Sequence, residues 1–318
     1  MTEIKIIENT SEIAAGTRGA SLGVGALKVV AHNHESELFG KYERYIVEDE
    51  NELLNRPVQY PTAKRIEGVV QVYQNVSDVV SHVLDNDNFP LVLAGDHASA
   101  GGTIAGIKKS HPDKRLGVIW IDAHADLHTP YTTPSGNIHG MPLATALGTD
   151  NLESQINDPV EEVKTYWNQM KDLNGVTPKI QSEDLVFIAV RDTEKPEDDL
   201  MERRGIRNFS VDEVRQKGLQ TVVTEIKEKL SDCDIIYVSF DVDSMDCILV
   251  SKGTGTPVEN GLTPEEAEHF VRQFSSWDKC CCVEFVEINP CLDNKINKMA
   301  EVAFDILDKT LIDLENRL

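Results

Sequence analysis

A run of alternating acidic and imidazole side chains follows the apolar segment Leu116–Ile121. Side chains alternate along an extended backbone, so Asp122, His124 and Asp126 would point to one side, with His128 next in line. Carboxylates held that close repel each other and resist ionisation unless a cation lies among them. The run therefore predicts a metal site where a buried strand ends. The alternative is a polar loop after a strand.

The same layout recurs in three further segments. In each, an apolar run ends in acidic or imidazole side chains: Leu91–Ala94 before His97, Ile235–Phe240 before Asp241 and Asp243, and Val283–Ile288 around Glu287. Parallel sheets gather their ligands at the carboxyl edge. We therefore expect these side chains to converge there.

The candidate metal ligands combine carboxylates with imidazoles and include no thiolate. They are His97, Asp122, His124, Asp126, Asp241 and Asp243. Such a set favours Mn²⁺, and less strongly Fe²⁺, Co²⁺ or Ni²⁺, whereas a structural zinc site would bring cysteines. It is too large for one open catalytic ion and suits two ions that share carboxylates, about 3.5–4 Å apart. Such a pair supplies hydroxide at neutral pH.

The elements that position these ligands alternate between strand and helix. Strands are expected at Ile4–Ile7, Leu91–Ala94, Leu116–Ile121, Leu185–Val190, Ile235–Phe240 and Cys282–Ile288. Helical spacing of apolar residues marks Ala63–Leu84 and Asp293–Leu318, and capping boxes stand at Ser210–Glu213 and Thr263–Glu266. The pattern predicts an α/β fold: a three-layer α/β/α arrangement with a mostly parallel, doubly wound sheet.

Composition limits the classes of protein and partner. With 318 residues, 40% of them hydrophobic, and no linker-like segment, the chain is expected to form a single domain over residues 1–318. A net charge of -23 argues against nucleic acid and anionic membranes as partners. The sequence has neither an apolar leader nor a run long enough to cross a membrane. The triplet Cys280–Cys282 reads as buried filler in a reducing, cytoplasmic compartment.

Three motifs together resemble a known superfamily. Gly95–His97, Asp122–Asp126 and Ser239–Asp246 look like the metal motifs of the ureohydrolases, which include arginases, agmatinases and formimidoylglutamases. The matching segments run from about Gly16 to the last helix. Further segments are similar to the arginase branch: Thr129–Gly140, Gly255–Pro257, Gly261–Thr263 and Glu287–Pro290.

The resemblance implies an arginase-like fold and a pair of Mn²⁺ ions. One ion would take His97, Asp122, Asp126 and Asp241, and the other His124, Asp122, Asp241 and Asp243, so that Asp122 and Asp241 bridge. A bridging hydroxide would attack the guanidinium carbon of L-arginine and release urea and L-ornithine. Asp126 would relay a proton, His139 would act as the proton shuttle, and Glu287 would bind the guanidinium group.

Substrate recognition is also carried over from the resemblance. Thr133, Ser135 and Asn137 would donate to the α-carboxylate, while Asp192, Glu194 and Glu197 would bind the α-ammonium group. Thr256 belongs to the arginase-like Gly255–Pro257 segment and is a further substrate-binding candidate. The resemblance also implies a homo-oligomer, either a trimer or a hexamer.

Several positions depart from the family pattern. His128 stands where arginases usually have Asn, and Glu194 where they usually have Asp. Asp246–Cys247 replaces Asp-Pro, and Ala94 and Ala98 replace Gly and Ser. Two alternatives to an arginase therefore stay open. One is a ureohydrolase for agmatine, guanidinobutyrate or guanidinopropionate, and the other is a catalytically silent binding or regulatory subunit. The intact ligand set opposes the second.

Overall fold

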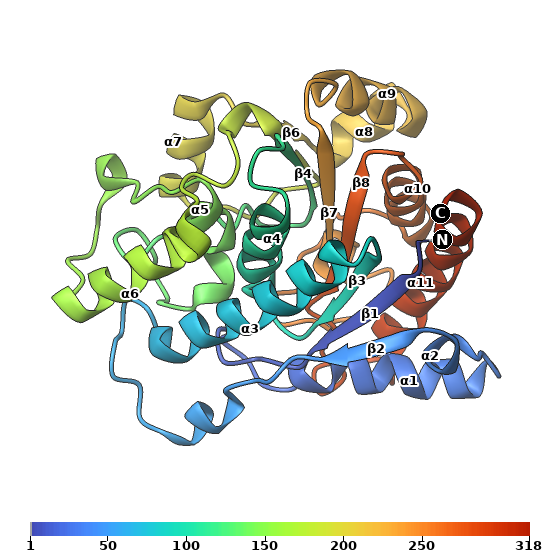
Figure 1. Ribbon diagram of the computed structural model, residues 1–318, viewed down its shortest axis with the longest axis horizontal. Helices are drawn as coiled ribbons and strands as arrows, with labels where there is room; N and C mark the ends of the chain where they lie inside the picture. Colours follow the sequence, from blue (N-terminus) through green and yellow to red (C-terminus); the bar gives the residue numbers. More distant parts are fainter. Residues whose placement is uncertain (1) are drawn as a thin grey trace.

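A parallel sheet forms the middle layer of the computed structural model, which describes residues 2–318 (Figure 1). Its strands are β1 Ile4–Asn9, β2 Glu43–Ile46, β3 Phe89–Ala94, β4 Leu116–Ile121, β5 Leu185–Ile188, β6 Arg207–Phe209, β7 Ile235–Asp241 and β8 Cys280–Val286. Within the described residues these eight strands follow the order β2-β1-β3-β8-β7-β4-β5-β6, and every pair is parallel. All carboxyl ends therefore lie along one edge.

Helices cover both faces of the sheet. They are α1 Gly23–Asn33, α2 Leu38–Lys41, α3 Ile66–Asp85, α4 Ser99–Ser110, α5 Pro142–Ala146, α6 Glu161–Lys171, α7 Lys195–Arg204, α8 Val211–Lys217, α9 Leu219–Lys229, α10 Pro264–Ser275 and α11 Lys298–Arg317. The layers α3–α6 and α1, α9–α11 pack on opposite faces. This confirms the predicted three-layer, doubly wound fold. No helix of residues 2–318 is both long and apolar enough to cross a membrane.

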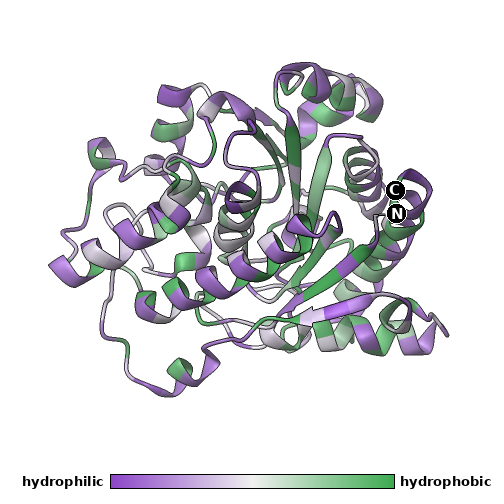
Figure 2. Cartoon of the chain, in the orientation of Figure 1, coloured by the Kyte–Doolittle hydropathy of each residue, from purple (hydrophilic) through white to green (hydrophobic). Residues whose placement is uncertain are grey.

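The central strands are buried on both faces, as parallel strands between two helical layers must be. All residues of β3, β4 and β7 are buried. Alternate residues serve the two cores: Val118 and Trp120 face one, and Ile119 and Ile121 the other. Figure 2 shows these strands as hydrophobic, whereas edge strand β2 is hydrophilic. Continuous apolar runs therefore mark the strands that carry the site.

Several predicted boundaries are wrong by a few residues. The strand expected at Leu185–Val190 ends at Ile188, because Ala189 adopts a φ of 73°. The strand expected at Cys282–Ile288 begins at Cys280 and ends at Val286, because Glu287 has a φ of 67°. Left-handed backbone breaks the ladder in both places. Strands β2 and β6 were not expected at all.

The two predicted capping boxes differ in outcome. Thr263 and Glu266 form a complete box at the start of α10, with proline in the first turn. At α8, the Ser210 side chain accepts from the Glu213 backbone N–H, but the Glu213 carboxylate pairs with Arg207 instead of returning to the cap. A stronger charged partner therefore replaces half of the second box.

The cysteine triplet lies on β8 and forms no disulfide. Cys280 and Cys282 are buried, Cys281 is partly buried, and all three are free thiols. Burial raises the pKa of Cys280 to about 11, which keeps this thiol protonated and unreactive at neutral pH. The expected filler role fits Cys280 and Cys282, and less fully Cys281.

Candidate metal centre

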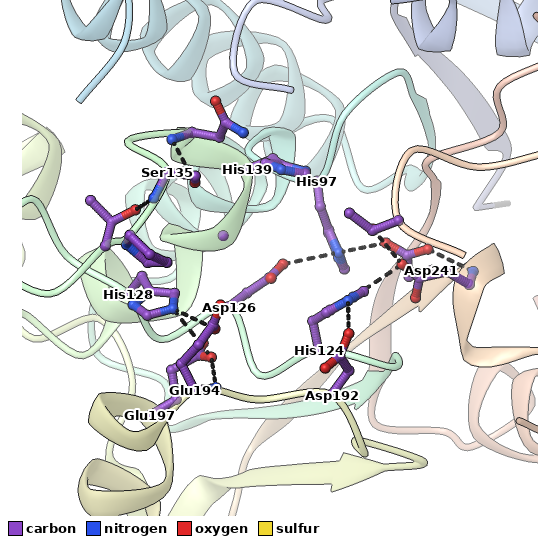
Figure 3. Close-up of a pocket in the computed structure, with 16 residues that line it drawn as sticks. His97, His124, Asp126, His128, Ser135, His139, Asp192, Glu194, Glu197 and Asp241 are labelled. Atoms are coloured by element: carbon purple, nitrogen blue, oxygen red, sulfur yellow. Dashed lines mark hydrogen bonds and ion pairs between the residues drawn. The ribbon is translucent and has the colours of Figure 1, made fainter. Parts of the chain in front are cut away.

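The predicted metal ligands meet at the carboxyl edge of the sheet, where three of the four central strands end. His97 lies between β3 and α4, Asp241 is the last residue of β7, and Asp243 follows it. Asp122, His124 and Asp126 come from the loop after β4. Figure 3 shows His97, Asp126 and Asp241 pointing toward one another. The structure therefore brings the predicted ligands together at one edge of the sheet.

The first ligand group surrounds one nitrogen of His97. His97 Nδ1 lies 3.0 Å from Asp122 Oδ2, 3.1 Å from Asp241 Oδ2 and 3.2 Å from Asp126 Oδ2. All four side chains are buried. Among residues 2–318, neither His97 Nδ1 nor Asp122 Oδ2 completes a well-oriented hydrogen bond, despite their closeness. Ligand atoms of His97, Asp122 and Asp126 lie within 4.8 Å of one another, a spacing that fits a divalent cation.

The second ligand group adjoins the first through Asp122. His124 Nδ1 lies 3.1 Å from Asp243 Oδ2 and 3.5 Å from Asp122 Oδ1. Asp122 thus turns one oxygen to each group, as a bridging carboxylate would. Asp241 Oδ2 lies near His97 Nδ1, and its Oδ1 accepts the Asp243 backbone N–H at 2.8 Å, as Asp122 Oδ1 accepts that of His124 at 2.7 Å. Thr256 donates to Asp243 Oδ2 at 3.0 Å and so contacts a ligand.

The buried carboxylates of the candidate metal centre favour the binding of positive charge. Burial, followed by neighbouring carboxylates, raises the pKa of Asp126 and Asp241 well above the usual range. Burial also raises the pKa of Asp243. Burial opposes ionisation of Asp122 as well, but the nearby His124 and His97 lower its pKa overall. Buried carboxylates in this number are costly unless cations pair with them, so the residues present suit two divalent ions.

The loop after β4 is not extended, contrary to the sequence-based expectation. The strand ends at Ile121, and Asp126 has a φ of 50°. The turn begins where the His124 backbone N–H donates to Asp122 Oδ1 at 2.7 Å. Such a side-chain-to-backbone bond competes with the ladder of a strand. The three ligands still converge, but through a compact turn and not through strand alternation.

The imidazole ring of His97 is contacted by two residues to which sequence reasoning assigned no role. Its Nε2 lies 2.8 Å from Ser239 Oγ, and its ring stacks on Trp120 with centroids 4.0 Å apart and planes inclined by 3°. Trp120 and Ser239 are register partners on β4 and β7. Ligating histidines commonly bond through the second ring nitrogen, which fixes their orientation. Ser239 lies in a quoted motif and Trp120 in an apolar strand, so neither residue type alone signals this role.

The proposed proton shuttle and guanidinium ligand form a pair beside the metal ligands. His139 Nδ1 lies 3.0 Å from Glu287 Oε1, which also accepts the His97 backbone N–H at 2.9 Å. Although burial opposes its charge, bonding to Glu287 raises the pKa of His139 to about 9. The same pairing outweighs burial and lowers the pKa of Glu287. Within residues 2–318, Glu287 Oε2 is buried and has no hydrogen-bond partner. One carboxylate oxygen of Glu287 is therefore unpaired, next to the cavity-lining His139.

A cavity of about 270 Å³ opens over the site. It is lined by His139 and by all the predicted metal ligands except Asp122, whereas Asp122 and Glu287 are not among its lining residues. Every substrate-binding residue predicted from the sequence lines it: His128, Thr133, Ser135, Asn137, Glu194, Glu197 and Thr256, together with Asp192. Pro134 and Gly140 also contribute to the lining. The volume is that of a small-molecule site, and its polar lining suits a charged, hydrogen-bonding ligand.

The loop that carries Thr133, Ser135 and Asn137 is fixed by its own hydrogen bonds. Thr133 Oγ1 accepts backbone N–H groups of Ser135 and Gly136, and Ser135 Oγ accepts that of Asn137. Asn137 Oδ1 accepts from Lys64 Nζ at 3.0 Å. Sequence reasoning missed Lys64, which is distant in the chain and belongs to no motif.

His128 is engaged by protein groups on both sides of its ring. Its Nε2 lies 2.8 Å from Glu194 Oε2 and 3.4 Å from Glu197 Oε2, and Nδ1 lies 3.3 Å from Thr132 Oγ1. Burial opposes the charged ring, but bonding to Glu194 raises the pKa of His128. Glu194 and Glu197 also form the capping box of α7. A substrate carboxylate would therefore have to displace one of these partners to reach His128.

The parallel sheet, the two adjoining His/Asp groups and the buried glutamate together define a metal-dependent hydrolase of the ureohydrolase class. The sequence matches the arginase family over residues 4–312. It is 32% identical to an arginase of Brevibacillus brevis over 98% of both chains, and 33% identical to an arginase of Bacillus subtilis over 97% of both. This chain belongs to the arginase family, whose members hydrolyse C–N bonds of guanidino compounds.

Solved structures agree with the sequence comparison. The structure of arginase from Bacillus caldovelox matches with a TM-score of 0.80 at 32% identity, covering 98% of each chain. The formimidoylglutamase of Bacillus subtilis matches with a TM-score of 0.74 at 18% identity, a likeness that shows the shared fold alone. The predicted family and fold class are thus confirmed.

Proposed function

We propose that this protein hydrolyses L-arginine to L-ornithine and urea with two Mn²⁺ ions per subunit. The observation that carries the proposal is Glu287, a buried carboxylate that pairs with the cavity-lining His139 and accepts the backbone N–H of the ligand His97, and whose second oxygen has no hydrogen-bond partner within residues 2–318. A planar guanidinium cation pairs well with such a carboxylate. Family membership supports guanidino hydrolysis, and the arginase-like loop at Thr133–Asn137 supports arginine as the substrate.

The ligand assignment follows the two groups described above. His97, Asp122, Asp126 and Asp241 would hold one ion, and His124, Asp122, Asp241 and Asp243 the other. When bound, two such ions lower the pKa of water enough to supply a nucleophile at neutral pH. Asp122 and Asp241 each place Oδ2 beside His97 Nδ1 and use Oδ1 to accept a backbone N–H. Asp122 Oδ1 also lies 3.5 Å from His124 Nδ1, which supports a bridging role for Asp122.

Proton transfer would involve His139 and Asp126. Hydrolysis adds water across a C–N bond, so the leaving amine must gain a proton. Asp126 has a raised pKa and lies at the ligand cluster, where it can carry the proton lost by the attacking water. His139, with a pKa of about 9, is an imidazolium at neutral pH and can deliver a proton within the cavity. Glu287 would hold the guanidinium carbon in place meanwhile.

The outer cavity would bind the amino-acid end of the substrate. Thr133, Ser135 and Asn137 would face the α-carboxylate, and the side chains of Asp192, Glu194 and Glu197 the α-ammonium group. His128 would influence both subsites through its pairing with Glu194.

We further infer a homo-oligomer, a trimer or hexamer, from the family resemblance. A cytoplasmic location is supported by the free cysteines, since thiols persist in reducing compartments.

A second candidate is hydrolysis of another guanidino compound, such as agmatine, guanidinobutyrate or guanidinopropionate. One observation favours it: both ring nitrogens of His128 are engaged by protein groups, so this residue is not free to receive an α-carboxylate.

The deciding experiment measures urea release with Mn²⁺ for arginine and these three compounds, with metal content determined in parallel. We expect two Mn²⁺ per chain and the highest kcat/KM for arginine. Equal values for arginine and agmatine would reject the arginase assignment and leave the broader ureohydrolase one. No urea from any compound in the Mn²⁺-loaded protein would point to the silent subunit.

A further inference from the structure

Lys64 is a cationic residue that the proposed chemistry does not use, yet it contacts the substrate cavity. Its Nζ donates to the Oδ1 of Asn137, a residue that lines the cavity. We propose that Lys64 determines specificity: its ammonium group favours substrates that carry a carboxylate at the end remote from the guanidinium group. The inference rests on the proposed function and identifies the remote carboxylate as the substrate group recognised at this subsite.

The position of Lys64 is fixed by the backbone on either side of the contact. Its N–H donates to the Gly136 carbonyl at 2.8 Å, which ties the segment before α3 to the loop of Asn137. Gly136 has a φ of 75°, and a Cβ there would lie 1.8 Å from the Pro61 carbonyl oxygen. Only glycine permits this approach. Arg65 next in the chain adopts a left-handed φ of 56°, a strained conformation for this residue type. The strain accompanies the turn that presents Lys64 to the loop.

Lys64 also decides which way the Asn137 amide faces. A carboxamide has one acceptor end and one donor end. Because Lys64 can only donate, it selects the acceptor Oδ1 and leaves Nδ2 as the free end. This NH₂ group lies over Gly16, where a Cβ would be 2.5 Å from it. A free donor end suits a carboxylate and not an ammonium group.

Charge strengthens the same preference. The other charged groups of the outer cavity are Asp192, Glu194 and Glu197, with His128 already paired to Glu194. These three carboxylates oppose an anion at this end of the cavity, and the ammonium group of Lys64 offsets them. We place a carboxylate bound to Asn137 Nδ2 about 6 Å from the Nζ of Lys64. At that separation, the attraction between two unit charges changes the affinity for the carboxylate by about 3-fold in water-like surroundings and by about 100-fold near a protein surface.

The test compares Lys64 variants on arginine and agmatine, which differ by the carboxylate. In Lys64→Met we expect kcat/KM for arginine to fall about 10-fold, mainly through KM. The kcat/KM for agmatine should stay level or rise, because agmatine is wholly cationic. Lys64→Gln keeps a donor without the charge and should resemble Lys64→Met, whereas Lys64→Arg should resemble the wild type. Lys309→Met, which makes the same charge change on α11, should alter neither substrate.

Three outcomes would overturn the proposal. An equal loss for both substrates in Lys64→Met would mean that Lys64 only supports the loop. Wild-type kinetics in Lys64→Gln would assign the effect to the hydrogen bond and not to the charge. An equal loss of kcat/KM for arginine in Lys309→Met would mean that the effect comes from the net charge of the protein and not from the position of Lys64. The proposed function fails separately, on the wild-type panel. If guanidinobutyrate proved the preferred substrate, the Lys64 test would proceed with it, since it too carries a carboxylate.

Discussion

Replacing Glu287 by glutamine removes one charge from the centre of the proposed site with almost no change in shape. Glu287 is 1% exposed, and its Oε2 has no hydrogen-bond partner within residues 2–318. Leaving a buried cation without its counter-charge costs about 3–5 kcal/mol. We therefore expect kcat/KM for arginine to fall by about 10²–10⁴. Bound Mn²⁺ should remain, because Glu287 belongs to neither ligand group.

The same substitution should also change the pH profile. Pairing with Glu287 raises the pKa of His139 to about 9, so the imidazolium persists as pH rises until about 9. Without the carboxylate, the pKa of His139 falls toward its ordinary value of 6.5. If the imidazolium is the acid, the residual activity of Glu287→Gln should decline at a lower pH than that of the wild type.

Glu284→Gln is a matched control three residues earlier. Glu284 is also fully buried and accepts from the Tyr237 hydroxyl at 2.5 Å. Burial raises the pKa of Glu284, so its carboxylate is less favoured than an exposed one, and it belongs to neither metal-ligand group nor the cavity lining. Urea release and metal content should stay near wild type in this control. Wild-type kcat/KM in Glu287→Gln, or loss of its Mn²⁺, would refute our assignment of Glu287.

Three further predictions test the metal ligands, the outer cavity and a buried lysine. Asp241→Ala should lose at least one Mn²⁺ by metal analysis and release no urea; full occupancy with near-normal turnover would contradict the ligand assignment. His128→Asn frees Glu194 and should flatten the pH dependence of KM for arginine, so an unchanged profile would speak against a role for His128. Burial lowers the pKa of Lys179 from 10.5 to about 8. Between these two pH values the folded state binds fewer protons than the unfolded state, so the free energy of unfolding rises with pH. Lys179→Met should therefore increase the free energy of unfolding at pH 7 by about 3 kcal/mol at most, with a gain that shrinks at alkaline pH in urea titrations; a gain independent of pH would exclude this cause.

The sequence predicted those parts of the fold where burial dominates. Strands β3, β4 and β7 lie between two helical layers, so their apolar runs are continuous and easily recognised. Strand β2 at the sheet edge is mostly exposed and has the sequence Glu-Arg-Tyr-Ile, while β6 has three residues. Neither strand has an apolar pattern, because neither is fully buried. Left-handed backbone at Ala189 and Glu287 likewise leaves no trace in residue type.

For the site, the sequence predicted the members better than their contacts. Ligand types and spacing bring His97, Asp122 and Asp241 to one edge because the strand ends fix them there. The pairing of His128 with Glu194 joins residues 66 apart, and that of Lys64 with Asn137 residues 73 apart. Such contacts depend on how loops pack against each other, and local pattern does not encode that packing.

The position of β8 has a consequence for how the chain is made. This last strand lies between β3 and β7, and within residues 2–318 no other pairing joins the strip β2-β1-β3 to the strip β7-β4-β5-β6. One strip supplies His97 and the other Asp122 and Asp241. During synthesis, both strips can form before Val286 has left the ribosome, each with an open edge that is prone to pair wrongly. The ligands from the two strips come together only when β8 pairs with both β3 and β7. Metal binding would therefore indicate a chain whose sheet is complete.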